Sequence, residues 1–288
     1  MKRFGIAVLV GVTLSLSCML CGGAWAQTDQ FEITDNGWTY MQDSLLTERL
    51  LHDWGFAYFY NNTGSDNLYQ NSWWYRTAGD TREYGFSNLT SLEVLSGNQA
   101  RLTFEEQGAD GTGDNLLRLA LTYSLTGISS DQAFVNIDWS LTNLTSGALP
   151  VDLFSYTDFD VDGFSDNDSA ELVSFSSAGG HIKAWDVDTG QELNIIANGS
   201  GLAAWEISPW SSIVDALTDD SISNLSSGTS PAPSNDLASG YQYTLALDGG
   251  QTVSGTMFQG VNVVPEPSSV AALALGLVGL APILRRKR

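Results

Sequence analysis

The feature that most constrains the fold is a strict alternation of apolar and polar side chains in several stretches of the chain. In LLRLALTYSLTG (116–127) and FVNIDWSLTN (134–143), every second residue is apolar. YQYTLALD (241–248) and ARLTFEE (100–106) repeat the pattern. Successive side chains of a strand point to opposite faces, so period two predicts strands with one buried face. The first two stretches predict an antiparallel hairpin across a polar turn at 127–132.

Short turn signals separate these stretches, including Asp188-Thr189-Gly190 and Asp248-Gly249-Gly250. Many short strands punctuated in this way are typical of a β-sandwich. The prediction for residues 28–262 is therefore one all-β domain, a single large antiparallel β-sandwich. One helix is expected at 211–215, capped by a serine after Pro209. Residues 223–240, rich in Ser and Pro, are expected to form a flexible polar loop.

The first 26 residues have the pattern of a secretory signal peptide. Lys2 and Arg3 precede an apolar run, and Ala24 and Ala26 provide the small side chains expected before a cleavage site. A lipoprotein signal that uses Cys18 or Cys21 is the alternative. Cleavage after Ala26 removes both cysteines of the chain, so the exported domain must fold on its hydrophobic core without disulfides.

Charge excludes one class of partner. Residues 27–264 hold six basic and 32 acidic residues, a formal charge of about −26. Such a surface repels nucleic acid and anionic membranes and favours solubility and divalent cations. We therefore expect no nucleic-acid binding, and the balance suits an extracellular setting.

The chain ends in a short apolar run followed by a cluster of positive charges. The run from 268 to 284 is 17 residues long, and as a helix it would measure roughly 26 Å against a hydrocarbon core of about 30 Å. Snorkelling by the flanking basic side chains extends that reach. The cluster is expected to stay on the cytoplasmic side; it consists of Arg285, Arg286, Lys287 and Arg288.

Pro265, Glu266 and Pro267 stand directly before this run. The order of Pro-Glu-Pro, short membrane segment and terminal basic cluster in residues 264–288 resembles the sorting signal of PEP-CTERM proteins. The resemblance implies export, anchoring in the inner membrane by a C-terminal helix, and processing by an exosortase. It also implies a final location at the cell surface or in an exopolysaccharide-containing matrix. A membrane anchor that is never cleaved is the alternative.

An acidic run, DFDVDGFSDNDSAE (158–171), is the sharpest polar cluster between the two ends. Its spacing matches the first half of a calcium loop. The position where a helical calcium loop needs glutamate is Ser169, so a Ca²⁺ site at a strand edge is expected rather than an EF-hand. A solvated acidic turn without an ion is the alternative. The candidate ligands are Asp158, Asp160, Asp162, Asp166 and Asp168.

Aromatic residues concentrate in FAYFY (56–60) and SWWYR (72–76). Core packing explains most of them. The adjacent pair Trp73 and Trp74 must point to opposite faces of a strand, which leaves one ring free to stack on a sugar.

No coherent catalytic set is visible in the sequence. The two histidines, His52 and His181, lie outside any metal-ligand spacing. The leading hypothesis is therefore a non-enzymatic exported protein with a structural or binding β domain. Apart from calcium, no cofactor is indicated. The alternative is a carbohydrate-binding or carbohydrate-active domain on the same β-sandwich, suggested by the aromatic and acidic clusters.

Overall fold

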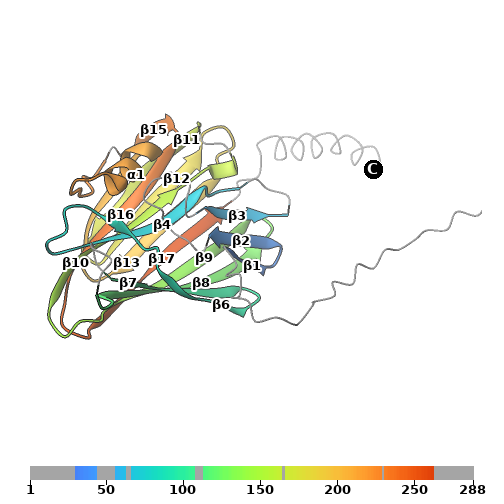
Figure 1. Cartoon of the computed structure of the whole chain (residues 1–288). Helices are drawn as coiled ribbons and strands as arrows, with labels where there is room; N and C mark the ends of the chain where they lie inside the picture. Colours follow the sequence, from blue (N-terminus) through green and yellow to red (C-terminus); the bar gives the residue numbers. More distant parts are fainter. Residues whose placement is uncertain are drawn as a thin grey trace, which may run out of the picture.

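The computed structural model describes residues 30–43, 56–62, 66–107, 113–163, 166–228 and 230–262. Within these residues the chain forms strands in three antiparallel sheets, one α-helix and one short 3-10 turn (Figure 1). The expectation of an all-β, antiparallel fold is confirmed. The helix α1 spans Trp210–Thr218 and the turn η1 spans Val161–Gly163.

The largest sheet has nine strands, with β15 at one margin and β6 at the other (Figure 1). In sheet order the strands are β15 (Ala232–Asn235), β11 (Asp168–Ser176), β12 (Gly179–Asp186), β13 (Glu192–Gly199), β17 (Thr252–Asn262), β9 (Gln132–Asn143), β8 (Leu117–Ser129), β7 (Gln99–Glu106) and β6 (Leu89–Ser96).

Two smaller sheets complete the domain. The five-stranded sheet contains β14 (Leu202–Pro209), β16 (Leu237–Leu247), β10 (Leu149–Asp158), β4 (Gln70–Thr77) and β5 (Tyr84–Gly85). The three-stranded sheet contains β1 (Gln30–Asp35), β2 (Trp38–Asp43) and β3 (Ala57–Asn61). The sequence predicted one sandwich and did not predict this third sheet.

The nine- and five-stranded sheets face each other across the main hydrophobic core. The rings of Trp139 (β9) and Tyr243 (β16) lie 4.9 Å apart, and Trp73 (β4) lies 6.4 Å from Trp139. The three-stranded sheet joins the same core through Tyr40, whose ring stacks 5.6 Å from Tyr123 of β8. One continuous core therefore holds all three sheets.

The predicted β8–β9 hairpin is confirmed, with Leu121 opposite Trp139. On both strands the apolar set is buried and the alternating polar set faces outward. A slip of one residue would turn the whole apolar set toward water, so the alternation also fixes the register.

The helix exists where it was expected, but the predicted serine cap is wrong. Pro209 is the N-cap, and no side chain bonds the first backbone N–H groups. Burial holds the helix instead: Ile213, Val214 and Leu217 pack in a second core cluster with Phe154 and other residues of the five-stranded sheet. Tertiary packing stabilises most short helices more than caps do.

The flexible loop predicted at 223–240 is wrong in its second half, which forms β15 and the first residues of β16. Strand β15 is four residues long and mostly exposed, and it pairs only with β11. Its sequence, Ala-Pro-Ser-Asn, has no apolar alternation that would reveal a strand.

Both large sheets end together at one pole of the sandwich. Gln259 of β17 donates a hydrogen bond to Thr157 of β10 (3.2 Å), and Asn262 accepts one from Gln132 at the β8–β9 turn (2.8 Å). We call this end the Asn262 pole. The opposite end, where β10 and β17 begin, is the Thr252 pole. Residue 263, the first of the C-terminal segment, follows directly from the Asn262 pole.

No helix within the described ranges is long and apolar enough to cross a bilayer. The predicted signal peptide (1–26, with Ala24 and Ala26) and the predicted membrane segment (268–284) lie outside these ranges.

Candidate functional site

Four carboxylates meet at the Asn262 pole, and we call Asp158, Asp160, Asp168 and Asp236 the acidic cluster. Asp158 is the last residue of β10, and Asp236 is the single residue between β15 and β16. One carboxylate oxygen from each of Asp158, Asp160 and Asp236 lies within 4.8 Å of the other two. Such a spacing suits a shared cation.

Strand pairing brings these distant residues together. Asp158 pairs with Ala238 of β16, and Asp168, the first residue of β11, pairs with Asn235 of β15. Between them the chain reverses through Asp162 and Gly163, which adopt left-handed backbone angles (φ 64° and 78°). Glycine and, to a lesser degree, aspartate tolerate this conformation.

Two members of the cluster are deeply buried: Asp158 is 2% exposed and Asp168 is 0% exposed. The Tyr156 hydroxyl donates to Asp158 Oδ2 and the Val161 N–H donates to Asp168 Oδ2, both at 3.2 Å. The Oδ1 atoms of both aspartates have no hydrogen-bond partner among the described residues. Buried carboxylate oxygens without partners are costly and call for an explanation.

The electrostatics of the cluster favour a positive ligand. Burial, followed by the charges of Asp236 and Asp160, raises the pKa of Asp158 well above its ordinary value. Burial is also the main cause that raises the pKa of Asp168 to about 9 and that of Asp236 to about 6, with further contributions from neighbouring carboxylates. The charges that raise the pKa of these three groups all belong to other aspartates.

Of the five aspartates predicted as ligands, the structure gathers Asp158, Asp160 and Asp168. Asp162 and Asp166 are not members of the three-carboxylate group, although the charge of Asp166 raises the pKa of Asp160. Asp236, 68 positions beyond Asp168, was not predicted as a ligand. Its only signal was an acidic residue in a polar segment, which identifies no partner.

Asp66 is a second carboxylate that was not predicted from the sequence. It precedes β4 and accepts hydrogen bonds from the backbone N–H groups of Phe59 (2.7 Å) and Asn67 (2.8 Å). Burial raises its pKa to about 6, and the charge of Asp160 contributes. Asp66 therefore adds negative charge beside the acidic cluster.

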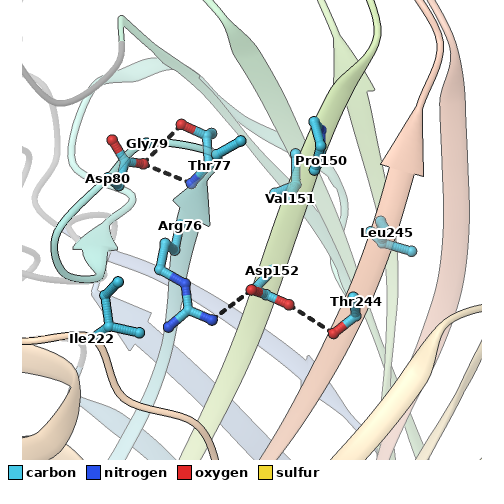
Figure 2. A pocket seen from close by; sticks show the side chains of 11 residues that line it. Arg76, Thr77, Gly79, Asp80, Pro150, Val151, Asp152, Ile222, Thr244 and Leu245 are labelled. Carbon is cyan, nitrogen blue, oxygen red and sulfur yellow. Dashed lines mark hydrogen bonds and ion pairs between the residues drawn. The ribbon is translucent and has the colours of Figure 1, made fainter.

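A cavity of about 220 Å³ lies near the Thr252 pole, lined by residues of β4, β10 and β16 (Figure 2). Arg76 forms ion pairs with Glu83 and Asp152, both at 2.5 Å. Its terminal nitrogens also donate to the Ser223 carbonyl (2.7 Å) and Asn224 Oδ1 (2.8 Å). Because the guanidinium is already satisfied, we assign Arg76 a structural role rather than anion binding.

A shallow groove of about 520 Å³ crosses the outer face of the nine-stranded sheet over β7, β8, β9 and β17. Most of the residues that line it are polar, among them the outward-facing Arg101, Thr122, Asp138, Ser140 and Thr256. Arg101 Nε donates to the Thr122 hydroxyl at 3.2 Å. The period-two alternation predicted this polar face but not its concavity.

The predicted stacking residues are buried: Trp73 is 0% and Trp74 is 5% exposed. They point to opposite faces as expected, but both faces of β4 are covered. Trp73 packs in the main core, and Trp74 makes an edge contact with Tyr156 (6.0 Å) in the second cluster. The expected free ring is therefore absent, because β4 lies inside a sheet whose outer face is covered by α1.

The one histidine in the described ranges, His181, lies on β12 with its Nε2 2.9 Å from Asn194 Oδ1. It belongs to the half of β12 remote from Asp186 and from the acidic cluster. His52 falls outside the described residues, as do Pro265, Glu266, Pro267 and the basic cluster at 285–288.

Comparison with protein-family models matches residues 263–288 to the PEP-CTERM protein-sorting motif. The tail is a PEP-CTERM sorting motif. The match confirms the resemblance carried by Pro265, Glu266 and Pro267 and by the basic cluster after the apolar run. The PEP-CTERM motif follows directly from β17, so it leaves the domain at the Asn262 pole.

Solved structures similar to this chain include a putative aldose 1-epimerase from Escherichia coli K12, with 9% identity, a TM-score of 0.46 and coverage of 82% of this chain and 99% of that one. A galactose mutarotase-like protein from Lactobacillus casei has 9% identity, a TM-score of 0.49 and coverage of 81% and 100%. A bacterial glucoamylase complexed with acarbose has 10% identity, a TM-score of 0.46 and coverage of 85% and 32%. A search of curated proteins found no match.

Proposed function

We propose that the protein is a non-enzymatic surface or matrix protein released from the inner membrane by an exosortase. The single observation that carries the proposal is the PEP-CTERM motif at residues 263–288. In this proposal the segment 268–284 anchors the chain transiently, and cleavage occurs near Pro265, Glu266 and Pro267. Prolines on both sides of Glu266 keep the backbone extended and out of the following helix, so an enzyme can grip it.

The β domain is the cargo in this proposal. Its large core needs no disulfide, and its formal charge of about −26 between residues 27 and 264 favours solubility outside the cell. These features support a structural or binding role.

The test follows the mass and location of the protein in the native host. We expect the wild-type chain to be shortened near the motif and found outside the membrane. Glu266→Ala should remain full length in the membrane fraction, whereas a chain truncated after Val264 should be secreted without anchoring. Glu93→Ala, an exposed glutamate on β6, is the matched control and should be processed normally. Identical processing of wild type and Glu266→Ala would contradict the proposal.

The groove on the nine-stranded sheet favours a second function, binding of an exopolysaccharide. Hydroxyl and guanidinium groups on a concave polar surface can hydrogen-bond sugar hydroxyls. Arg101, Thr122 and Ser140 supply such groups in this groove. We expect Arg101→Ala to weaken retention on purified matrix polysaccharide in affinity electrophoresis, whereas Arg82→Ala, outside the groove, should not. Equal retention of the two variants would rule out the groove as the binding surface, and release of reducing sugar by the wild type would indicate an enzyme instead.

A further inference from the structure

The acidic cluster combines two independent observations. The first is geometric, because single oxygens of Asp158, Asp160 and Asp236 lie within 4.8 Å of one another. The second is the buried, unpartnered Oδ1 of Asp168, a residue outside that group. Asp168 is close enough to these three carboxylates that the charges of Asp160 and Asp236 both act on it. An unpaired carboxylate with no exposed surface is explained when a cation lies beside it.

We propose that Asp158, Asp160 and Asp236 bind a calcium ion at the Asn262 pole, with Asp168 as the adjoining buried carboxylate. The ligand atoms are all carboxylate oxygens, which hard divalent cations prefer, whereas zinc and copper sites use imidazole or thiolate groups. Calcium accepts six to eight oxygens in a flexible arrangement, so water and backbone carbonyls can complete the shell. Magnesium demands a stricter octahedral geometry.

The ion would connect three separate parts of the chain. Asp158 ends β10, Asp160 lies in the connection to η1, and Asp236 joins β15 to β16. Without the ion, these segments bring like charges together. With the ion, the same charges hold the edge strand β15 and the reversal at η1 against the end of the five-stranded sheet. Calcium would therefore stabilise the folded domain rather than take part in a reaction.

The proposed location outside the cell suits a calcium site. Extracellular calcium modules work with dissociation constants of about 10⁻⁴ to 10⁻³ M, matched to the calcium outside cells. The exported domain would meet such calcium concentrations only outside the cytoplasm. It would therefore bind the ion after export. The site needs no sorting signal to function, so it can be tested independently of the proposed processing.

The test uses the full-length protein in detergent and compares excess EDTA with about 10 mM CaCl₂. We expect the wild type to bind one ion by titration calorimetry, with a rise in Tm of roughly 5–10 °C when calcium reaches about 100 times the Kd. Asp158→Asn and Asp236→Asn should lose the Tm rise and bind calcium at least about 10-fold more weakly, because each removes one charged ligand.

Asp162→Asn is the matched control. It removes one negative charge from the same turn, outside the three-carboxylate group, and asparagine tolerates the left-handed backbone at this position. It should keep the calcium-dependent Tm rise, which separates the site from general screening of an acidic surface. In EDTA, Asp158→Asn should melt no lower than the wild type, because asparagine keeps the size of the side chain and adds no charge beside Asp160 and Asp236, so loss of folding is distinguishable from loss of binding. Equal calcium-dependent Tm rises in wild type, Asp158→Asn and Asp236→Asn would overturn the proposal, as would no calcium-dependent change in the wild type.

Discussion

Arg76 shows how one side chain organises the Thr252 pole. It is 9% exposed and links β4 to Asp152 of β10 and to Glu83, which is 4% exposed. Burial is the main cause that raises the pKa of Glu83, while Arg76 and the Ser223 N–H oppose it. The guanidinium is therefore the counter-charge that lets a carboxylate remain inside the protein.

Replacing Arg76 should be among the costly substitutions in the domain. Arg76→Leu leaves Glu83 buried without its partner, and we expect a loss of about 3–5 kcal/mol in the free energy of unfolding. Arg118→Leu is the control, because the Arg118 side chain is 47% exposed in its ion pair with Glu105, and it should cost less than about 1 kcal/mol. Urea unfolding of both variants measures the difference. A loss below about 1 kcal/mol for Arg76→Leu would contradict the role of counter-charge.

At the scale of residues, Asp236 is the member of the acidic cluster that could not be predicted from the sequence. The run from Asp158 to Asp168 is dense in acids, so part of the cluster could be predicted from spacing alone. Asp236 enters through the pairing of β10 with β16 and of β11 with β15, in which Asp158 lies opposite Ala238, 80 positions away, and Asp168 lies opposite Asn235, 67 positions away. No local pattern encodes such a pairing, and therefore the third carboxylate could not be predicted.

Strand β17 is the central strand of the nine-stranded sheet, between β13 and β9. Gly255 lies in close contact with both neighbouring strands: a Cβ added there would be 2.3 Å from the Asn198 carbonyl oxygen of β13 and 2.5 Å from the Trp139 ring of β9. Trp139 lies directly opposite Gly255 on β9. The glycine therefore lets β17 fit against both of its neighbours.

Gly255→Ala should force the Trp139 ring or the β13 backbone to shift. We expect a loss of about 1–3 kcal/mol in the free energy of unfolding, with a changed near-UV circular dichroism spectrum from the displaced tryptophan. Gly97→Ala, in the β6–β7 turn, is the control because a Cβ there meets no atom within 4 Å. It should stay within about 0.5 kcal/mol of the wild type. If both alanine variants had the same stability, the close approach at Gly255 would be unimportant.

Whether an element could be predicted depended on how many of its faces are buried. Strands β7, β8, β9 and β16 contain stretches with one buried and one polar face, and their alternation is visible in the sequence. Strand β4 is buried on both faces along its whole length, so its sequence carries no alternation and its paired tryptophans suggested an exposed ring. Burial by a second layer is a tertiary property that a local pattern does not contain.

At the scale of the whole molecule, the many carboxylates make stability depend on pH. Asp66 and Asp236 have pKa values raised to about 6, and burial raises that of Glu106. A carboxyl whose pKa is raised on folding stabilises the protein fully below its unfolded pKa, near 4, and this stabilisation is lost as pH rises through the folded pKa. Together with general repulsion among the acids, this makes the metal-free protein less stable toward neutral pH.

We therefore expect the Tm in EDTA to fall between about pH 5 and pH 8, across the raised values near 6. Added NaCl, at about 0.5 M, should reduce the fall by screening the exposed charges, and should leave the part due to buried carboxylates. Differential scanning calorimetry at several pH values measures both effects. A Tm that rises toward pH 8 in EDTA would contradict this account.

Attachment at one pole also determines how the molecule is presented to its surroundings. The chain leaves the described domain at Asn262, beside the β8–β9 turn, while the 12 residues of β9 run roughly 35–40 Å to the opposite end. In the proposed anchored state the Asn262 pole is therefore the attached end, and the Arg76 cavity and the turns around Gly147 and Gly249 lie at the opposite, Thr252 pole. The groove over β7, β8, β9 and β17 lies on the flank between the two poles, so attachment at the Asn262 pole would leave it uncovered.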